Sequence, residues 1–314
     1  MMGVAGWPLV SIVTPSLNQG RFIANTIESV LSQDYPRIEY FVVDGGSTDE
    51  TLEVLHRYRG RLRWVSEPDG GQSAAVNKGW RQTSGEIVAW LNSDDTYLPG
   101  AVSQVVAFLQ EHPEIDAVYG NCDYIDLEGR FLRPYPTRPY NYLELVRTAF
   151  NYIPQPATFV RRQALEAIGY LDETLHYIMD LDCWLRLGAQ HTLAYLPVRL
   201  ATLRLHPQAK SVHRIGGFAA EFIYVYQRLF ALPHLPATVR AIETEAMSNV
   251  YYLAAYFAFW AGDLQSARRY GLRAWRLRPF RVRRLLPFLA LGKPGLKLAQ
   301  ALRGHPCDNT TGSW

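Results

Sequence analysis

Short apolar runs rich in β-branched residues alternate with helical patterns over the first hundred residues, and this alternation limits the fold more than any other feature. The apolar runs cover residues 9–14, 39–43, 62–66 and 86–91, and the helical patterns between them cover 21–32, 49–58 and 72–82. This order is typical of βαβ units, which build a mainly parallel sheet flanked by helices. We therefore predict an α/β fold with a Rossmann-like sheet.

A polar or glycine-rich segment follows each of these four expected strands. The segments are residues 15–18, 44–47, 67–71 and 92–95. In open α/β sheets, ligands bind at the carboxyl ends of the strands. The four segments are therefore expected to meet at one site.

The rest of the chain changes character along its length. A helix is expected at 101–111, a strand at 117–119, helices at 163–168 and 182–187, and strands at 192–196 and 200–205. From Gly217 to Arg278 the pattern is wholly helical, so we predict an α/β domain at 1–213 and a helical C-terminal region at 214–314. Residues 250–279 have spacings close to those of one tetratricopeptide-type hairpin, and an ordinary helical hairpin is the favoured interpretation.

Composition narrows the class of protein. The 314 residues are 48% apolar and 19% charged, as in a globular protein, and a net charge of +3 gives no case for a nucleic-acid partner. Residues 264–306 contain no Asp or Glu but eleven Lys and Arg. A solvated helical face is the commoner outcome for such a run, and an anionic acceptor or membrane surface is the alternative.

Targeting signals and cysteine spacing bear on localisation. The first twenty residues do not have the pattern of a signal peptide, and no apolar run approaches the roughly 20 residues of a membrane span. Cys122, Cys183 and Cys307 are widely spaced, which argues against a disulfide framework. We expect a cytoplasmic protein, and peripheral contact at the inner membrane face through its basic tail is the alternative to a fully solvated tail.

Three carboxylates at strand ends are the first candidates for chemistry. Asp94 and Asp95 follow an apolar strand, where neighbouring carboxylates are costly unless they meet a cation such as Mg²⁺ or Mn²⁺. Capping of the helix that starts near Pro99 is the structural alternative for one of them. Asp44 is not explained by capping, and its position suits a carboxylate that binds the base or ribose of a nucleotide. Neither GxGxxG nor a P-loop is present.

Six motifs in order carry a family resemblance. They are the runs 10–18, 29–33, 43–49, 69–71 with 77–79, 85–86 and 91–95, which read VSIVTPSLN, SVLSQ, VDGGSTD, DGG with NKG, GE and LNSDD. Together they resemble the family 2 glycosyltransferases of the GT-A fold, and weaker similarity continues to about residue 213. The implied architecture is a GT-A type sheet flanked by helices, with a helical C-terminal extension.

The resemblance implies a donor site and a metal site. Asn92, Ser93 and Asp94 occupy the DxD motif, with Asn in place of the first Asp, which leaves Asp94 and Asp95 as ligands of Mn²⁺ or Mg²⁺. His206 falls where similar enzymes place a histidine near the metal, and a structural role is the alternative. The residues implied to bind the donor nucleotide are Pro15, Asp44, Asp69, Asn77 and Ser93.

The same resemblance implies a catalytic base and an acceptor side. Asp180 matches the catalytic base of inverting members, although Met179 stands where many relatives have Glu. Gln155 and Asp182 are placed on the acceptor side, and helix capping is the alternative for both Asp180 and Asp182. The QxxRW motif of processive members is missing, so single additions are expected.

The expected activity is inverting transfer of a sugar, a hexose by type, from a nucleoside-diphosphate sugar to an acceptor hydroxyl. UDP is the expected nucleotide, and the acceptor would be a glycan or lipid-linked glycan in cell-surface polysaccharide or glycoconjugate synthesis. Two alternatives stay open. One is a catalytically degenerate scaffold, which the departures at Asn92 and Met179 keep open. The other is a sugar nucleotidyltransferase, whose basic glycine-rich first loop is poorly matched.

Overall fold

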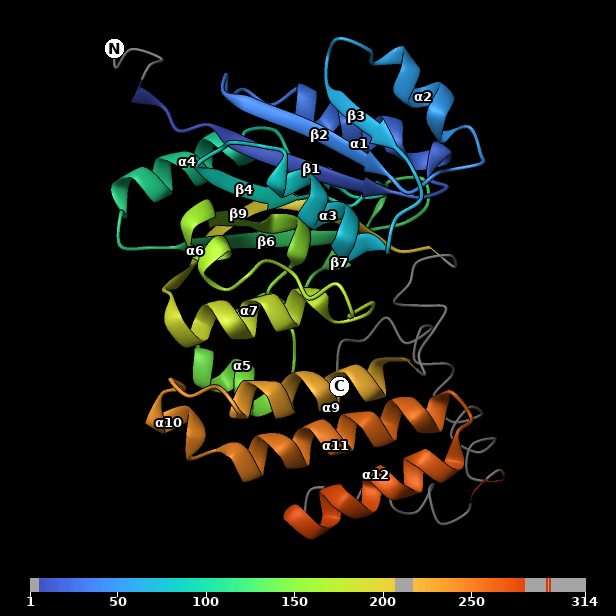
Figure 1. Cartoon of the computed structure of the whole chain (residues 1–314), viewed down its shortest axis with the longest axis vertical. Helices are drawn as coiled ribbons and strands as arrows, with labels where there is room; N and C mark the ends of the chain where they lie inside the picture. The colour runs from blue at the N-terminus through green and yellow to red at the C-terminus, as the bar shows by residue number, and fades with distance from the viewer. Residues whose placement is uncertain (1–5, 207–216, 280–291, 293, 295–314) are drawn as a thin grey trace. The chain divides into compact units, whose positions relative to one another are not determined.

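The computed structural model describes residues 6–206, 217–279, 292 and 294 (Figure 1). The chain divides into two compact units, Met1–Tyr140 with Tyr152–Leu205, and Asn141–Asn151 with His206–Trp314. The boundary predicted near His213 lies in 207–216, outside the described residues. The sequence did not indicate that residues 141–151 belong with the C-terminal unit.

A nine-stranded mixed sheet forms the centre of the first unit. Its order is β3-β2-β1-β4-β8-β6-β9-β5, with β7 paired to β6. The strands β3, β2, β1 and β4 are parallel, β6 and β9 are also parallel, and β8 runs antiparallel between β4 and β6. The bounds are β1 Val10–Ser16, β2 Ile38–Asp44, β3 Arg63–Ser66, β4 Ile87–Trp90, β5 Thr96–Tyr97, β6 Ala117–Ile125, β7 Phe131–Pro134, β8 Thr158–Arg161 and β9 Leu193–Arg204.

Helices flank this sheet (Figure 1). They are α1 Gly20–Leu31, α2 Thr51–Arg57, α3 Gln72–Arg81, α4 Ala101–Glu111, α6 Arg162–Ala167 and α7 Met179–Gln190. The apolar sides of α1 and α4 join the main core with β1, β2 and β4. The α/β fold predicted from the alternating pattern is therefore confirmed.

Three buried tryptophans join α3 and α7 to the sheet. Trp90 of β4 packs edge-on against Trp80 of α3, with ring centroids 5.4 Å apart, and stacks on Trp184 of α7 at 5.6 Å. All three side chains are at most 2% exposed. Since buried aromatic side chains contribute much of the energy of a core, this contact fixes both helices against the same strand.

Two predictions about the middle of the chain were wrong. The strands expected at 192–196 and 200–205 form one strand, β9, which continues through Pro197. Its pairing with β6 shifts register on both sides of Asn121, and this irregularity accommodates the proline, which cannot donate to a ladder. The helix expected at 182–187 begins three residues earlier, at Met179, so neither Asp180 nor Asp182 is its N-cap.

The second unit is helical over its described residues, as predicted. It contains α5 Tyr142–Thr148, α9 Phe218–Phe230, α10 Ala237–Arg240, α11 Glu243–Trp260 and α12 Leu264–Leu277. The last two helices form a hairpin whose turn has Gly262 at φ +81° and Asp263 as an N-cap that accepts a hydrogen bond from the Ser266 N–H at 3.0 Å. In the described ranges, no helix is both long and apolar enough to cross a membrane.

Candidate active site

The parallel strands place all four polar segments at one edge of the sheet. Ser16 at the end of β1 pairs with Asp44 at the end of β2, and Asp44 pairs with Ser66 at the end of β3. Beyond the end of β4, the Leu91 N–H donates to the Val13 carbonyl at 2.9 Å. Segments 15–18, 44–47, 67–71 and 92–95 therefore leave the sheet on the same side, as the strand pattern predicted.

Asp44 is fully buried and holds the turn after β2. Its Oδ2 accepts hydrogen bonds from the backbone N–H groups of Gly46 at 3.1 Å and Ser47 at 2.9 Å, and from the Ser66 hydroxyl at 2.6 Å. Its Oδ1 accepts from the Ser47 hydroxyl at 2.5 Å. The carboxylate thus ties the turn to β3, and its contact with a donor stays a prediction.

The Asp69 segment reaches the same turn. Asp69 is exposed, and its Oδ1 accepts a hydrogen bond from the Gly71 N–H at 2.8 Å. A Cβ added to Gly45 would lie 3.0 Å from Asp69 Oδ2, so the absence of a side chain at 45 allows this close approach. The predicted donor contacts of Asp69, and of the buried residues Pro15 and Ser93, remain untested.

Asn92 lies at the centre of an amide network at the end of β4. Its Nδ2 donates to Asp95 Oδ2 at 3.2 Å and to Gln155 Oε1 at 2.9 Å. Its Oδ1 accepts from Gln72 Nε2 at 2.7 Å, and Gln155 Nε2 donates in turn to the Trp90 carbonyl at 2.5 Å. An amide at 92 meets these partners as both donor and acceptor, which a carboxylate does not.

The two acidic residues after Asn92 differ in environment. Asp95 is 2% exposed, and its Oδ1 accepts a hydrogen bond from the Arg204 N–H at 3.0 Å. Burial, and then the neighbouring Asp94 carboxylate, raise the pKa of Asp95 well above its usual range. Asp94 is half-buried. Because Asp95 is buried and its carboxylate already binds the Arg204 N–H, Asp94 is the better candidate for a metal ligand.

A divalent cation fits this donor set only if the substrate completes its coordination. Among the described residues, no three His, Cys, Asp or Glu side chains form a group that could hold a metal. Mg²⁺ is nevertheless often held by one or two carboxylates together with substrate phosphates, and Asp94 supplies one such oxygen ligand. His206 is buried and is the first residue of the second unit, so its place near a metal stays a prediction.

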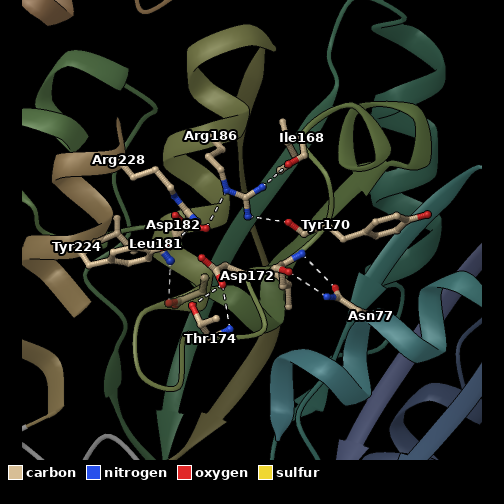
Figure 2. Close-up of polar contacts among 12 residues, drawn as sticks. Asn77, Ile168, Tyr170, Asp172, Thr174, Leu181, Asp182, Arg186, Tyr224 and Arg228 are labelled. Carbon is tan, nitrogen blue, oxygen red and sulfur yellow. Dashed lines mark hydrogen bonds and ion pairs between the residues drawn. The ribbon is translucent and has the colours of Figure 1, made fainter. Parts of the chain in front are cut away.

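The predicted base lies in the first turn of α7. Asp180 Oδ1 accepts a hydrogen bond from the Leu181 N–H at 2.8 Å. Two residues on, Asp182 is buried and pairs with Arg186 Nε at 2.8 Å (Figure 2). This ion pair explains why a carboxylate is tolerated there, and the predicted acceptor contacts of Asp182 and of buried Gln155 stay predictions.

Asn77 connects α3 to the loop that precedes α7. Its Nδ2 donates to the Leu171 carbonyl and to Glu173 Oε1, both at 2.9 Å, and its Oδ1 accepts from the Leu171 N–H at 3.1 Å. The side chain is fully buried. These bonds give Asn77 a role in holding the loop, while its predicted donor contact remains untested.

Sequence reasoning missed three residues that organise this site. Gln72 is held on Asn92, and Arg186 donates to the carbonyls of Ile168 at 2.6 Å and Tyr170 at 2.7 Å. Arg204 is buried and donates to the Asp94 carbonyl at 3.0 Å. A lone arginine at an expected buried position, as in the run 200–205, is the signal that would have found Arg204.

The chain is similar in sequence to a known protein family and to several bacterial proteins. The sequence model of the family described as Glycosyl transferase family 2 matches residues 11–169, just over half of the chain. A Rickettsia bellii protein described as an uncharacterized glycosyltransferase is 28% identical over 215 residues, which cover 65% of this chain and 31% of that protein. One from Mycobacterium tuberculosis is 31% identical over 183 residues, covering 57% of this chain and 68% of the relative.

Two solved structures share the fold. The crystal structure of Staphylococcus aureus TarS 1–349 in complex with UDP-GlcNAc has a TM-score of 0.70 at 17% identity, covering 93% of this chain and 91% of that one. The Pyrobaculum calidifontis mannosyltransferase PcManGT in complex with GDP-Man and Mn²⁺ has a TM-score of 0.61 at 20% identity, covering 96% and 88%. With the family match and the sheet described above, the chain belongs to glycosyltransferase family 2 and has the GT-A fold.

Proposed function

We propose that this glycosyltransferase moves one sugar at a time, with inversion, from a nucleoside-diphosphate sugar to an acceptor hydroxyl. The sugar is a hexose by type, and UDP is the nucleotide we expect. The observation that carries the proposal is the convergence of the Asp44 turn and segment 92–95 at one edge of the parallel sheet. In open α/β sheets this edge is where ligands bind.

Asp180 is the proposed general base. In a single displacement, the acceptor oxygen attacks the anomeric carbon, the bond to the diphosphate oxygen breaks, and the acceptor proton passes to the carboxylate. A carboxylate within about 3 Å of the hydroxyl can accept that proton. Asp180 is suited to this by its place in the first turn of α7, a helix anchored by Trp184 on β4.

Asp94 is the proposed ligand of a divalent cation, Mn²⁺ or Mg²⁺. Such an ion, when bound, supplies positive charge to the leaving diphosphate. The chain's own contribution is to fix the segment that carries Asp94. The Arg204 guanidinium donates a hydrogen bond to the Asp94 carbonyl at 3.0 Å. Asn92 and Asp95, which flank Asp94 in the sequence, are joined to each other by a hydrogen bond.

The structural neighbours support the donor class, and the acceptor class is part of the proposal. TarS was solved with UDP-GlcNAc and PcManGT with GDP-Man and Mn²⁺, which supports a nucleotide-sugar donor here. We propose a glycan or lipid-linked glycan acceptor in cell-envelope polysaccharide synthesis, on the cytoplasmic side of the membrane. The tail segment expected to contact that membrane, residues 281–289, lies outside the described residues.

Two substitutions test the proposal. Asp180→Asn should abolish transfer and leave donor affinity unchanged, because the amide cannot accept the proton. Asp94→Ala should weaken the binding of donor in Mn²⁺ and have little effect on binding in EDTA. Asp34→Asn, at an exposed carboxylate of the same unit, is the matched control. Transfer at the parental rate by Asp180→Asn would refute the assignment of the base.

The substrate itself is found by measuring hydrolysis and binding for a panel of nucleotide sugars with Mn²⁺. Metal-dependent binding and turnover of one donor would support the proposal. If no nucleotide sugar of the panel is bound or hydrolysed, the scaffold alternative is favoured. Release of a nucleoside triphosphate only after addition of pyrophosphate would identify a nucleotidyltransferase instead.

A further inference from the structure

The exposed side of α12 combines large apolar side chains with arginines. Ala267, Gly271 and Ala274 are buried and face the helical core of the second unit. At 3.6 residues per turn, one continuous arc on the other side of the helix carries exposed residues. We call this arc the α12 outer face, and it consists of Gln265, Arg268, Arg269, Leu272, Trp275 and Arg276.

Two large apolar side chains are exposed within this face. Leu272 is 46% exposed and Trp275 is 44% exposed. Arg269 and Arg276 of the same arc flank them, while Arg268 lies beside Gly292, where an added Cβ would be 3.0 Å from its Nη2. The sequence has no acidic residue from Leu264 to Pro306 to offset the positive charge. A tryptophan and a leucine among arginines, without carboxylates, form an amphipathic helical surface with a positive charge.

We propose that the α12 outer face docks on the surface of an anionic lipid bilayer. Trp275 and Leu272 would enter the boundary between head groups and acyl chains, where an indole ring is favoured. The arginines would contact lipid phosphates while their alkyl stems cover apolar surface. Each such arginine adds roughly a fivefold gain in binding to an anionic surface.

Other occupants explain the face less well. A nucleic acid would use the arginines and leave Leu272 without a role. In a twofold dimer through this face, each copy would bring Arg268, Arg269 and Arg276 towards the same residues of its partner, and like charges would oppose the contact. An anionic bilayer satisfies both the apolar and the charged side chains.

The inference extends the membrane contact of the proposed function from the tail to a described helix. It does not rest on transfer chemistry, since vesicle binding is measured without substrate. Donor hydrolysis measured without vesicles tests the transferase separately. A negative result in vesicle binding therefore does not refute the transferase proposal, and a negative result in donor hydrolysis does not refute the membrane proposal.

The experiment is sedimentation of the full chain with vesicles of phosphatidylcholine alone, or with about 30% phosphatidylglycerol, over a range of salt. We expect binding to the anionic vesicles that weakens as salt rises. Leu272→Ser with Trp275→Ser should weaken it at least tenfold, and Arg269→Gln with Arg276→Gln about 25-fold. Circular dichroism and thermal unfolding confirm that each variant is folded.

Two controls match these changes elsewhere on the surface. Phe131→Ser with Leu132→Ser removes exposed apolar side chains of β7, and Arg57→Gln with Arg59→Gln removes exposed charge near α2. Both should bind like the parent. The proposal is overturned if the α12 variants also bind like the parent, if both vesicle types bind equally, or if the α12 changes abolish self-association measured without lipid.

Discussion

Replacing Asn92, which is half-buried, by aspartate places a second carboxylate beside buried Asp95 at the end of β4. The change restores the first position of the DxD pattern but removes the Nδ2 donor. That donor bonds Asp95 Oδ2 at 3.2 Å and Gln155 Oε1 at 2.9 Å. A new carboxylate oxygen would face acceptors in both places, so we expect Asn92→Asp to destabilise the first unit.

The size of the effect follows from these two bonds. A hydrogen bond to a charged group contributes about 1.5–3 kcal/mol, and a neutral one about 0.5–1.5 kcal/mol. Their loss therefore costs about 2–4.5 kcal/mol in the free energy of unfolding at neutral pH. For a unit of this size, that corresponds to a fall of roughly 5–15 °C in Tm.

The deficit depends on pH with a definite sign. Burial and Asp94 already raise the pKa of Asp95, and a second carboxylate beside it raises the pKa of the pair further. A carboxyl group whose pKa is higher in the folded state than in the unfolded state makes the folded protein less stable as pH rises above the unfolded-state pKa of about 4. The deficit of Asn92→Asp should therefore be larger at pH 8 than at pH 5.

The assay is thermal and urea unfolding in EDTA at pH 5 and pH 8, since a bound metal would stabilise the added charge. Asn141→Asp is the matched control, because Asn141 Oδ1 caps α5 by accepting from the Glu144 N–H at 2.9 Å and an aspartate caps equally well. An unchanged Tm for Asn92→Asp at pH 8, or a deficit at pH 5 as large as at pH 8, would refute the reasoning.

Two further changes test the scaffold around the site. Arg186→Gln removes the positive charge that pairs with buried Asp182 and should lower the free energy of unfolding by about 3 kcal/mol, measured with urea. Arg186→Lys should recover part of this loss. Equal stability of the Gln variant and the parent would contradict the role of the ion pair. Gly85→Ala places a Cβ 2.5 Å from the backbone nitrogen of Ser11 and should cost about 1–3 kcal/mol, whereas Gly60→Ala, a strained but uncrowded site, separates crowding from backbone strain. A Tm for Gly85→Ala within 1 °C of the parent would contradict this prediction, because it would show that β1 can shift away from the added Cβ without loss of stability.

The sequence alone predicted the alternation of strands and helices in the first hundred residues, because each element there has its own apolar period. The observed β1, Val10–Ser16, and α1, Gly20–Leu31, differ from the predicted bounds by one or two residues. The motif order also indicated the family that the comparisons show. These features are local, and short windows of residues carry them.

Only the tertiary structure decided which polar residues serve the scaffold. Asn77 and Asp182 match the sequence patterns of a binding site, yet their hydrogen bonds hold the 171–173 loop and Arg186. Asp94 and Asp95 are neighbours in sequence, and packing buries only the second and raises its pKa. Burial and hydrogen bonding depend on partners many residues away, such as Arg204, so no local pattern determines them.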